Sequence, residues 1–365
     1  MFNSVYKNKK VLITGHTGFK GSWLSIWLNN LGAQVYGLSL DPTCKPSNYQ
    51  ACNLQAHLKE DLRVDVTCKQ DVITAINRIQ PDFIFHLAAQ ALVKDSYKDP
   101  VKTMMVNAIG TVNVLDALRE IKNKVTVVLI TSDKCYHNVE WLWGYKETDQ
   151  LGGKDPYSAS KAMTEIAIRS FVNSYFPQDG NVSIGIGRAG NVIGGGDWAA
   201  DRIVPDCVKA WSEDKRVDIR SPKATRPWQH VLEPLSGYLH LGSVLSASGL
   251  HHGEAFNFGP LSSSNFSVEQ LIEKMAIFWD KVNWNDTSSY TGHVHEAGLL
   301  RLNCEKAQTF LDWEPVMNFD ETVEITSAWY KSFYGAASPC MHDITNEQIQ
   351  GYVDLAIARG RKWGN

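Results

Sequence analysis

The sequence predicts an α/β fold in which a doubly wound parallel sheet is followed by a smaller C-terminal α/β lobe. Three observations support this prediction. Short apolar runs alternate with helical patterns over the first half of the chain, a glycine-rich turn joins the first run to the first helix, and the alternation loosens beyond about residue 190. Such alternation is typical of buried parallel strands with helices on both faces of the sheet.

The elements of the sheet region follow one another in a regular order. Strands are expected at Lys10–Thr14, Gln34–Leu40, Phe83–Leu87, Val125–Thr131 and Val182–Arg188, where apolar residues run together. Helices are expected at Ser22–Leu31, Asp71–Ile79, Thr103–Ile121 and Tyr157–Tyr175. Gly32 suits the end of the first helix, because glycine adopts the left-handed conformation without steric cost.

The second half predicts a lobe of shorter elements. A loop is expected at Gly194–Asp197, a short strand at Val217–Ile219, and helices at Val204–Trp211, Val268–Trp279 and Phe319–Phe333. We therefore divide the chain into a nucleotide-binding domain over residues 1–190, a lobe over residues 191–335 that mainly binds substrate, and a tail over residues 336–365 with a final helix.

Composition limits the function classes. The chain of 365 residues has 44% hydrophobic and 21% charged residues with a net charge of −3, which gives no electrostatic case for nucleic acid or an anionic membrane. No apolar stretch approaches the roughly 18 residues of a membrane span, and the N-terminus leads directly into a strand without a signal peptide. The protein is expected to be cytoplasmic.

The cysteines and histidines do not form a metal-binding pattern. The seven cysteines are scattered without a Cys-x-x-Cys pair, which is typical neither of a zinc site nor of a disulfide framework. No acidic ligand completes the spacing of His251-His252 or of His293-x-His295. We therefore predict no metal site.

The turn from Gly15 to Gly21 predicts a dinucleotide site in a Rossmann-type sheet. Its spacing is G-x-x-G-x-x-G, and it lies between the first strand and the first helix. Glycines let the backbone turn tightly and approach a pyrophosphate, which binds at the helix N-terminus. The turn residues expected to contact the cofactor are Gly15, Thr17, Gly18, Phe19 and Gly21.

The remaining cofactor contacts are expected at the ends of other strands. The ribose is assigned to Ser39, with Asp41 as the alternative, and NAD is favoured because no arginine lies nearby in the sequence to bind a 2′-phosphate. Asp65 with Val66 is a candidate for the adenine edge, and a surface aspartate is an equal alternative. Further candidates are Leu87, Ala88, Ala89 and Thr131 at strand ends and Asn107 as a polar anchor under the site.

Tyr157 and Lys161 form the most informative pair of the chain. Four residues apart on a helix, they lie on one face, and a nearby ammonium favours the phenolate of a tyrosine whose usual pKa is about 10. Such a tyrosine is a general base for alcohol oxidation. The triplet Ser132-Asp133-Lys134 adds a hydroxyl, a carboxylate and an amine that alcohol oxidation alone does not need. We expect redox chemistry coupled to an acid–base step.

The order of these motifs resembles that of the extended short-chain dehydrogenase/reductase family over roughly residues 8–330. The motifs are Gly15–Gly21, His86–Ala89, Asn107-x-x-Gly110-Thr111 and Tyr157-x-x-x-Lys161. Within that family, the sugar-nucleotide 4,6-dehydratases carry Thr-Asp-Glu where this chain has Ser132-Asp133-Lys134. Lysine at the third position, together with residues 140–147, 190–198 and 226–231, is similar to the subfamily that acts on CDP-glucose.

The resemblance implies a dehydration with three steps. Tyr157 takes the proton of the C4 hydroxyl as hydride passes to NAD⁺, Lys161 binds the nicotinamide ribose, and Ser132 bonds the C4 oxygen. A base then removes the C5 proton while Asp133 protonates the leaving C6 hydroxyl, and hydride returns to C6. Lys134 is the candidate base, directly or through a water; the alternatives are enolate stabilisation and a structural salt bridge to Asp133.

The resemblance also implies partners and alternatives. The substrate contacts it implies are Gln90, Ser132, Asn191, Arg202 and Arg226, and the helices at 103–121 and 157–175 would pair in a homodimer or homotetramer. A 4-epimerase or reductase of the same family would keep Tyr157 and Lys161 without needing Asp133 and Lys134. A non-catalytic nucleotide-sensing protein is the alternative from another class.

Overall fold

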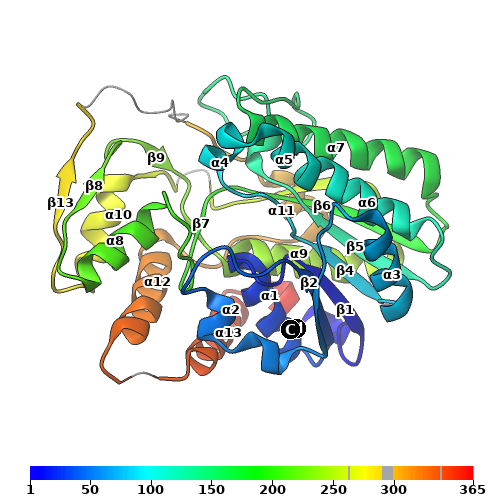
Figure 1. Cartoon of the computed structure of the whole chain (residues 1–365), viewed down its shortest axis with the longest axis horizontal. Helices are drawn as coiled ribbons and strands as arrows, with labels where there is room; N and C mark the ends of the chain where they lie inside the picture. Colours follow the sequence, from blue (N-terminus) through cyan, green and yellow to red (C-terminus); the bar gives the residue numbers. More distant parts are fainter. Residues whose placement is uncertain (262–263, 290–298, 338, 365) are drawn as a thin grey trace.

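The computed structural model of the chain describes residues 1–261, 264–289, 299–337 and 339–364 (Figure 1). Its centre is a seven-stranded sheet in the order β11-β6-β5-β4-β1-β2-β3, in which all neighbouring strands pair parallel. The strands are β1 (Lys10–Thr14), β2 (Gln34–Ser39), β3 (Glu60–Arg63), β4 (Phe83–His86), β5 (Val125–Ile130), β6 (Val182–Ala189) and β11 (Ala255–Phe258). The predicted doubly wound α/β fold is confirmed.

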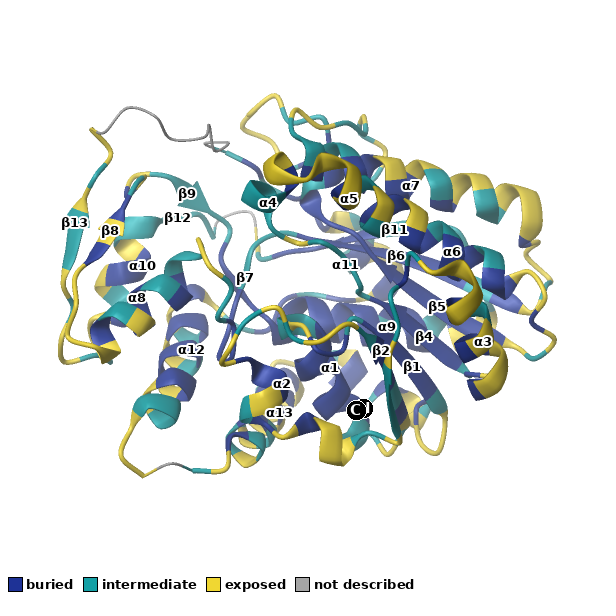
Figure 2. Cartoon of the chain, viewed as in Figure 1, coloured by how far each residue is buried: buried dark blue, intermediate teal, exposed yellow. Residues whose placement is uncertain are grey.

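Helices cover both faces of this sheet, and the strands between them are buried (Figure 2). One layer contains α3 (Lys69–Ile79), α4 (Val93–Lys98), α5 (Pro100–Met104), α6 (Gly110–Leu118) and α7 (Pro156–Tyr175). The other contains α1 (Phe19–Asn30), α9 (Leu232–Ser248) and α13 (Met341–Ala358). Both layers pack against the sheet through apolar side chains, so the central strands β1, β4, β5 and β6 are buried on two sides, whereas edge strand β3 is only partly buried.

Two helices differ from their expected bounds. Helix α1 begins at Phe19 rather than at Ser22, because Gly18 serves as its N-cap. The helix expected at Thr103–Ile121 is instead α5, a π-helical turn over Met105–Ile109, and α6, which ends at Leu118. π-Helical turns occur frequently at functional sites.

The C-terminal lobe is built from short strand pairs and helices. The pairs are β7 (Val192–Ile193) with β10 (Gln229–His230), β8 (Val217–Ile219) with β13 (Trp284–Asp286), and β9 (Thr225–Arg226) with β12 (Phe266–Ser267). The helices are α8 (Ile203–Ser212), α10 (Val268–Met275) and α12 (Phe319–Tyr334). Helix α10 ends at Met275 rather than at Trp279, because a turn follows it. Short helices elsewhere are α2 (Asn48–Ala51) and α11 (Glu305–Leu311).

Segments after residue 190 also contribute to the sheet region. Strand β11 is its edge strand, and α9 packs against β5 and β6. Helix α13, in the predicted tail, packs against α1, where the rings of Trp27 and Tyr352 meet edge to face with centroids 5.8 Å apart. Near the two ends of the chain, Phe2 stacks on Trp363 at 5.3 Å. The boundary at residue 190 stays a prediction.

Among the residues described, no helix combines the length and apolar character needed to cross a membrane.

Candidate active site

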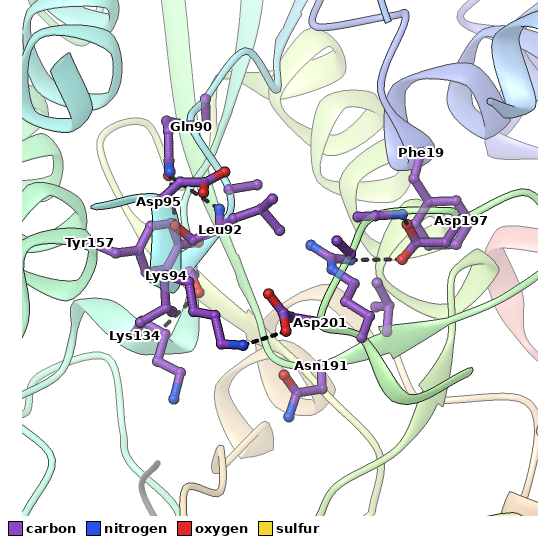
Figure 3. A pocket seen from close by; sticks show the side chains of 18 of the residues that line it. Phe19, Gln90, Leu92, Lys94, Asp95, Lys134, Tyr157, Asn191, Asp197 and Asp201 are labelled. Atoms are coloured by element: carbon purple, nitrogen blue, oxygen red, sulfur yellow. Dashed lines mark hydrogen bonds and ion pairs between the residues drawn. The ribbon is translucent and has the colours of Figure 1, made fainter. Parts of the chain in front are cut away.

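A cavity of about 1850 Å³ lies between the carboxyl ends of the sheet strands and the C-terminal lobe. Parallel sheets bind ligands at this edge. The volume exceeds the 300–1,000 Å³ that is usual for one small ligand, so a dinucleotide and a second ligand fit together. The cavity is lined by the glycine turn, the catalytic candidates and β8 with β13 of the lobe, and Figure 3 shows some of these side chains.

The glycine turn fits a dinucleotide pyrophosphate. Gly15 has φ +78°, and a Cβ there would come within 2.7 Å of the Ala88 backbone nitrogen. A Cβ at Gly21 would come within 2.1 Å of the Gly15 carbonyl oxygen. No side chain caps α1 at Gly18, so the N–H groups of its first turn are available to an anion. Only glycines permit this close packing of turn, helix and strand.

Both ribose candidates line the cavity. The Ser39 and Thr17 hydroxyls are 2.8 Å apart. The Asp41 carboxylate accepts a hydrogen bond of 2.8 Å from Arg63 Nε, so the expectation that no arginine lies nearby is wrong: the sheet brings β3 beside β2. Arg63 also donates hydrogen bonds to Asp61 and Tyr49. The N–H groups of its guanidinium that a 2′-phosphate would need are therefore already engaged by these partners. The choice between Ser39 and Asp41 stays open.

The adenine candidates also lie at the cavity wall. Asp65 Oδ1 accepts hydrogen bonds from the Thr67 amide and hydroxyl, both at 2.8 Å, which stabilises a local turn. Val66 is buried against Gly110, where a Cβ would come within 2.7 Å of Val66 Cγ2. This geometry is compatible both with a contact between Asp65 and the adenine and with Asp65 as a surface aspartate.

Asn107 lies behind the wall, in the π-helical turn, and is not among the residues that line the cavity. Its amide Nδ2 donates to Ser160 Oγ at 2.8 Å, and its Oδ1 accepts from the Gln90 backbone N–H at 2.8 Å. It therefore connects the loop after β4 to α7. This arrangement matches the anchor role expected of Asn107, but a direct cofactor contact does not fit.

Tyr157 and Lys161 lie in the first turns of α7. The helix begins where Asp155 accepts a hydrogen bond from the Ser158 amide at 3.0 Å and Pro156 occupies the first position, both typical of an N-terminus. Lys161 Nζ lies 6.0 Å from the centroid of the Tyr157 ring. Both side chains are buried and line the cavity.

Burial dominates the protonation of this pair. It raises the pKa of Tyr157 to about 12, against the effect of a hydrogen bond with Ser132, and it lowers the pKa of Lys161 to about 8. The tyrosine pKa therefore shifts opposite to the direction expected from the lysine charge alone. A cationic nicotinamide beside Tyr157 would favour the phenolate.

Ser132, Asp133 and Lys134 form a short turn directly after β5. Ser132 Oγ donates to Asp133 Oδ1 at 2.8 Å and accepts from the Lys134 amide at 3.2 Å. Asp133 is buried against Gly190, where a Cβ would come within 3.2 Å of Asp133 Oδ2. Lys134 lines the cavity, and no ion pair joins it to Asp133, both residues being described. The geometry therefore disfavours the structural salt bridge.

The four remaining substrate candidates line the same cavity. Arg202 Nη1 forms an ion pair with Asp197 Oδ2 at 2.9 Å, and Arg226 Nη1 donates to the Thr225 carbonyl at 2.9 Å. Asn191 follows β6, and Gln90 follows β4. In Figure 3, Asn191 comes from the lobe side while Gln90 and Tyr157 lie together at the opposite wall.

Sequence reasoning missed Lys20, the variable residue between Phe19 and Gly21. Lys20 lines the cavity, and burial lowers its pKa to about 8, with Arg202 and Lys161 acting in the same direction and Asp133 in the opposite one. Its signal was a charged residue at a non-glycine position inside the turn. The turn residues expected to contact the cofactor included Thr17 and Phe19 but not Lys20.

Sequence reasoning also missed Glu165, the partner of Arg188 in a buried ion pair between the catalytic helix and β6. Arg188 on β6 donates to both Glu165 oxygens at 2.8 Å, and both side chains are almost fully buried. Thr131 Oγ1 donates a hydrogen bond to Glu165 Oε1 at 2.5 Å. This bond fixes the position of the Thr131 side chain at the end of β5. The signal was Glu165 four residues after Lys161, on the same helix face.

In the described part of the chain, no three histidine, cysteine or acidic residues are arranged to hold a metal ion. His251 pairs with Glu254 at 3.3 Å, and His252 accepts from the Ile184 amide at 3.0 Å. His293 and His295 lie outside the described residues.

Comparisons with known proteins agree with the motifs. The sequence pattern of the family described as GDP-mannose 4,6 dehydratase matches residues 12–326. A CDP-glucose 4,6-dehydratase of Salmonella typhimurium is 42% identical over 90% of this chain and 92% of its own length. A GDP-mannose 4,6 dehydratase of Cricetulus griseus is 26% identical over 86% and 89%. The fold is similar to that of a Bacillus cereus UDP-glucuronic acid 4-epimerase solved with UDP-glucuronic acid and NAD, with a TM-score of 0.74, 23% identity, and 89% and 100% coverage.

Proposed function

Because the chain belongs to the GDP-mannose 4,6 dehydratase family, we propose that it is an NAD-dependent lyase that converts CDP-D-glucose to CDP-4-dehydro-6-deoxy-D-glucose. Membership confirms the resemblance predicted from the motifs. The observation that carries the proposal is the presence of Asp133 and Lys134 beside Tyr157, in the same cavity as the glycine turn. Alcohol oxidation and a 4-epimerisation need the tyrosine, whereas elimination of water needs an additional acid and base.

CDP-glucose is the substrate favoured by the degree of similarity. The Salmonella typhimurium CDP-glucose 4,6-dehydratase is 42% identical to the chain, whereas the Cricetulus griseus GDP-mannose 4,6 dehydratase is 26% identical. Lysine at position 134 supports the same choice by resemblance. The nucleobase is therefore assigned by likeness rather than by a contact in the cavity.

NAD would be held by the glycine turn and the strand ends that line the cavity, with Tyr157 and Lys161 at its reacting end. When bound, it supplies the hydride acceptor for oxidation at C4 and, once reduced, the hydride donor for C6. The close backbone packing of Gly15, Gly21 and Ala88 leaves space that a side chain would fill, so the residues present fit the group.

The protein side chains move the protons. Tyr157 takes the C4 hydroxyl proton, and the Ser132 hydroxyl beside it bonds the C4 oxygen. Asp133, held by Ser132 at 2.8 Å, protonates the leaving C6 hydroxyl. Burial of these groups excludes water, which strengthens each electrostatic contact.

We assign removal of the C5 proton to the neutral amine of Lys134, which lines the cavity without an ion pair to Asp133. The resulting ammonium returns a proton to C5 after hydride has reached C6, so the proton count closes and solvent deuterium can enter at C5. The test is incorporation of solvent deuterium at C5 during turnover by the Lys134→Met variant. Loss of C5 exchange, with oxidation at C4 retained, is the expected result. Exchange at the wild-type rate would instead leave Lys134 as a stabiliser of the enolate.

The proposed reaction is tested with CDP-glucose and NAD⁺. The expected product is a 4-keto sugar, detected by its ultraviolet band in alkali and by loss of the C6 hydroxyl in the mass of the sugar. A C4-epimerised product without a keto band would instead identify an epimerase. Binding of the nucleotide sugar without turnover would identify a sensing protein.

We also propose that the chain forms a homodimer, or a pair of dimers, through α5, the π-helical turn and α7. Val101, Met105 and Ile109 recur every four residues and are 71%, 42% and 38% exposed. Met163 and Ile166 on the neighbouring α7 are 43% and 60% exposed. An exposed apolar stripe across two packed helices supports a symmetric interface.

The cytoplasmic location and the lack of nucleic-acid and membrane partners stay predictions from composition.

A further inference from the structure

We infer that Lys20, within the dinucleotide turn, is a binding residue for the diphosphate of the nucleotide-sugar substrate. The inference rests on the proposed function and adds a cation to its substrate site. It concerns the substrate rather than the cofactor, whose pyrophosphate is matched by backbone N–H groups of the same turn.

The position of Lys20 follows from its neighbours. Phe19 packs against the loop of the lobe, since a Cβ at Gly194 would come within 3.2 Å of Phe19 Cζ. Figure 3 shows Phe19 beside Asp197, the carboxylate that holds Arg202. The next residue, Lys20, lines the cavity, where Asp133, Arg202 and Lys161 are its charged neighbours. The first turn of α1 therefore contributes a cation to the cavity wall, with Arg202 among its charged neighbours.

The charges around Lys20 are not balanced. Among the partly buried cations that line the cavity, Lys94 and Arg220 are paired with Asp201, and Arg202 is paired with Asp197. Within the described ranges, no carboxylate is within ion-pairing distance of Lys20, Lys134 or Lys161. Buried charges are costly without a counter-ion.

A nucleoside diphosphate sugar carries two negative charges and would offset this excess. Lys161 and Lys134 are committed to the reaction at the sugar, as proposed above. Lys20 has Arg202 as a charged neighbour, and the resemblance assigns Arg202 to the phosphates. A charge-assisted hydrogen bond from Lys20 to a phosphate oxygen would restore its charge balance.

The experiment compares wild type with Lys20→Met and Lys20→Arg. Calorimetry measures the affinity for CDP, UDP, GDP and dTDP, and the comparison uses whichever nucleoside diphosphate wild type binds most tightly. Lys20→Met is expected to weaken that affinity by about 10- to 100-fold, to leave the NAD⁺ affinity unchanged, and to raise KM for CDP-glucose more than it lowers kcat. Lys20→Arg should restore most of the affinity.

The pH dependence provides a second readout. Lys20 faces Asp133 after β5, Lys161 on α7 and Arg202 before α8. Its ammonium is present below its pKa of about 8 and is lost above it, so wild-type affinity should fall between neutral pH and about pH 9. The Lys20→Arg variant keeps its positive charge over this pH range, so its affinity for the nucleoside diphosphate should fall less steeply than that of wild type.

Lys98→Met is the matched control. Lys98 is an exposed lysine at the cavity rim, paired with Asp95 at 2.8 Å, so its removal takes away the same charge without the same contact. If Lys20→Met and Lys98→Met lost the same affinity for the nucleoside diphosphate, the inference would be overturned. The loss would then come from the overall positive charge of the cavity rather than from a contact with Lys20. An unchanged affinity in Lys20→Met, or a loss confined to NAD⁺, would overturn the inference as well.

The outcomes separate this inference from the proposed function. A wild-type protein that binds another nucleoside diphosphate but does not dehydrate CDP-glucose contradicts the proposed function alone. One that binds none of the four contradicts both.

Discussion

At the scale of single residues, the cavity combines a tyrosine whose proton is hard to remove with lysines whose protons are easily lost. Burial is the common cause, since it disfavours the charged form of each group. The site therefore depends on its ligands to supply the missing charges. A cationic nicotinamide lowers the pKa of the tyrosine and so favours its phenolate. An anionic diphosphate raises the pKa of a neighbouring lysine and so favours its ammonium.

Removal of the Tyr157 hydroxyl is expected to affect turnover and not binding. Tyr157→Phe keeps the ring that lies 6.0 Å from Lys161 Nζ but has no group to take the C4 proton. We expect kcat to fall by about 10²- to 10⁴-fold, with the affinity for CDP within a few-fold of wild type. Steady-state kinetics and calorimetry check this. A variant with normal kcat and raised KM would mean that Tyr157 only binds the sugar.

At the scale of elements, the start of α1 serves both ligands. Its glycines create the space for the cofactor, and its first charged residue, Lys20, is the one proposed above to bind the substrate diphosphate. Both properties depend on the contact between the turn and the end of β4, where Gly15 meets Ala88.

Gly15→Ala should therefore reduce cofactor binding. The new Cβ would come 2.7 Å from the Ala88 nitrogen at φ +78°, a strain of about 1–2 kcal/mol that also narrows the turn. We expect at least about a tenfold loss of NAD⁺ affinity with a lowered Tm. Gly351→Ala is the control, since nothing lies within 4 Å of its Cβ on α13, and it should leave both quantities unchanged or raise Tm. If Gly15→Ala bound NAD⁺ with wild-type affinity, the close contact between Gly15 and Ala88 would not be needed for cofactor binding.

The Glu165–Arg188 pair connects α7 to β6 and, through Thr131, to the end of β5. Arg188→Met leaves the Glu165 carboxylate buried without its partner, which should lower the free energy of unfolding by about 3–5 kcal/mol. Urea denaturation measures the loss. The double variant Glu165→Gln/Arg188→Met removes the unpaired charge and should recover part of it. A double variant as unstable as the single one would mean that packing, rather than charge, is decisive.

The sequence predicted those elements that have a strong local signal. Apolar runs in the sequence predict strands β1, β4, β5 and β6. The capping residues Asp155 and Pro156 mark the N-terminus of α7. The π-helical turn at Met105–Ile109 was not predicted, because no residue in it interrupts the helical pattern of the segments on either side. Edge strand β11 joins the sheet through pairing with β6, which no local pattern encodes.

The same distinction holds for the site. The candidate site residues taken from the sequence line the cavity as expected, apart from Asn107. Arg63 was missed because β3 reaches Asp41 only through the sheet order. Lys20 was missed although it lies within a motif, because its function depends on residues 133 and 202, which the fold brings to it.

At the scale of the whole molecule, the exposed stripe on α5 and α7 predicts the assembly. Ile166→Glu places a charge in the proposed interface, and we expect it to shift the protein from dimer or tetramer to smaller species in sedimentation analysis. Ile277→Glu is the control, because Ile277 is 70% exposed on the C-terminal lobe. An unchanged oligomer in Ile166→Glu would exclude this face as the interface.

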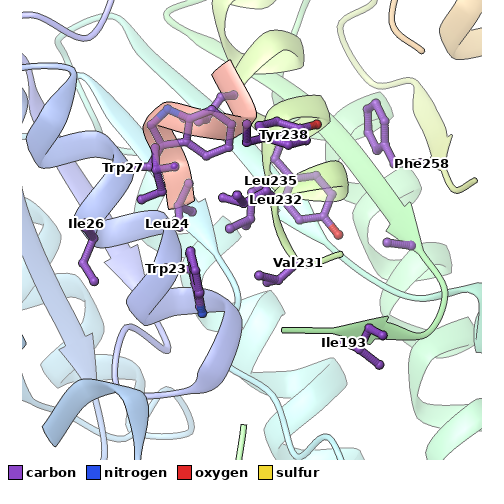
Figure 4. Packing of buried hydrophobic residues seen from close by; sticks show 14 of the residues in the cluster. Trp23, Leu24, Ile26, Trp27, Ile193, Val231, Leu232, Leu235, Tyr238 and Phe258 are labelled. Atoms are coloured by element: carbon purple, nitrogen blue, oxygen red, sulfur yellow. The ribbon is translucent and has the colours of Figure 1, made fainter. Parts of the chain in front are cut away.

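The core beneath the sheet joins segments from both halves of the chain. Figure 4 shows Trp23 and Trp27 of α1 packed with Leu232, Leu235 and Tyr238 of α9. The nucleotide-turn helix α1 is therefore fixed by a helix from the second half of the chain.

The packing of α13 on α1 also has a consequence for protein synthesis. Helix α1 is translated long before Tyr352 and Trp363, whose rings pack on Trp27. The nascent chain therefore exposes this apolar face of α1 until these residues have been translated, which favours aggregation or chaperone binding. Phe2 can stack on Trp363 and complete the cover of this face only after Trp363 has left the ribosome.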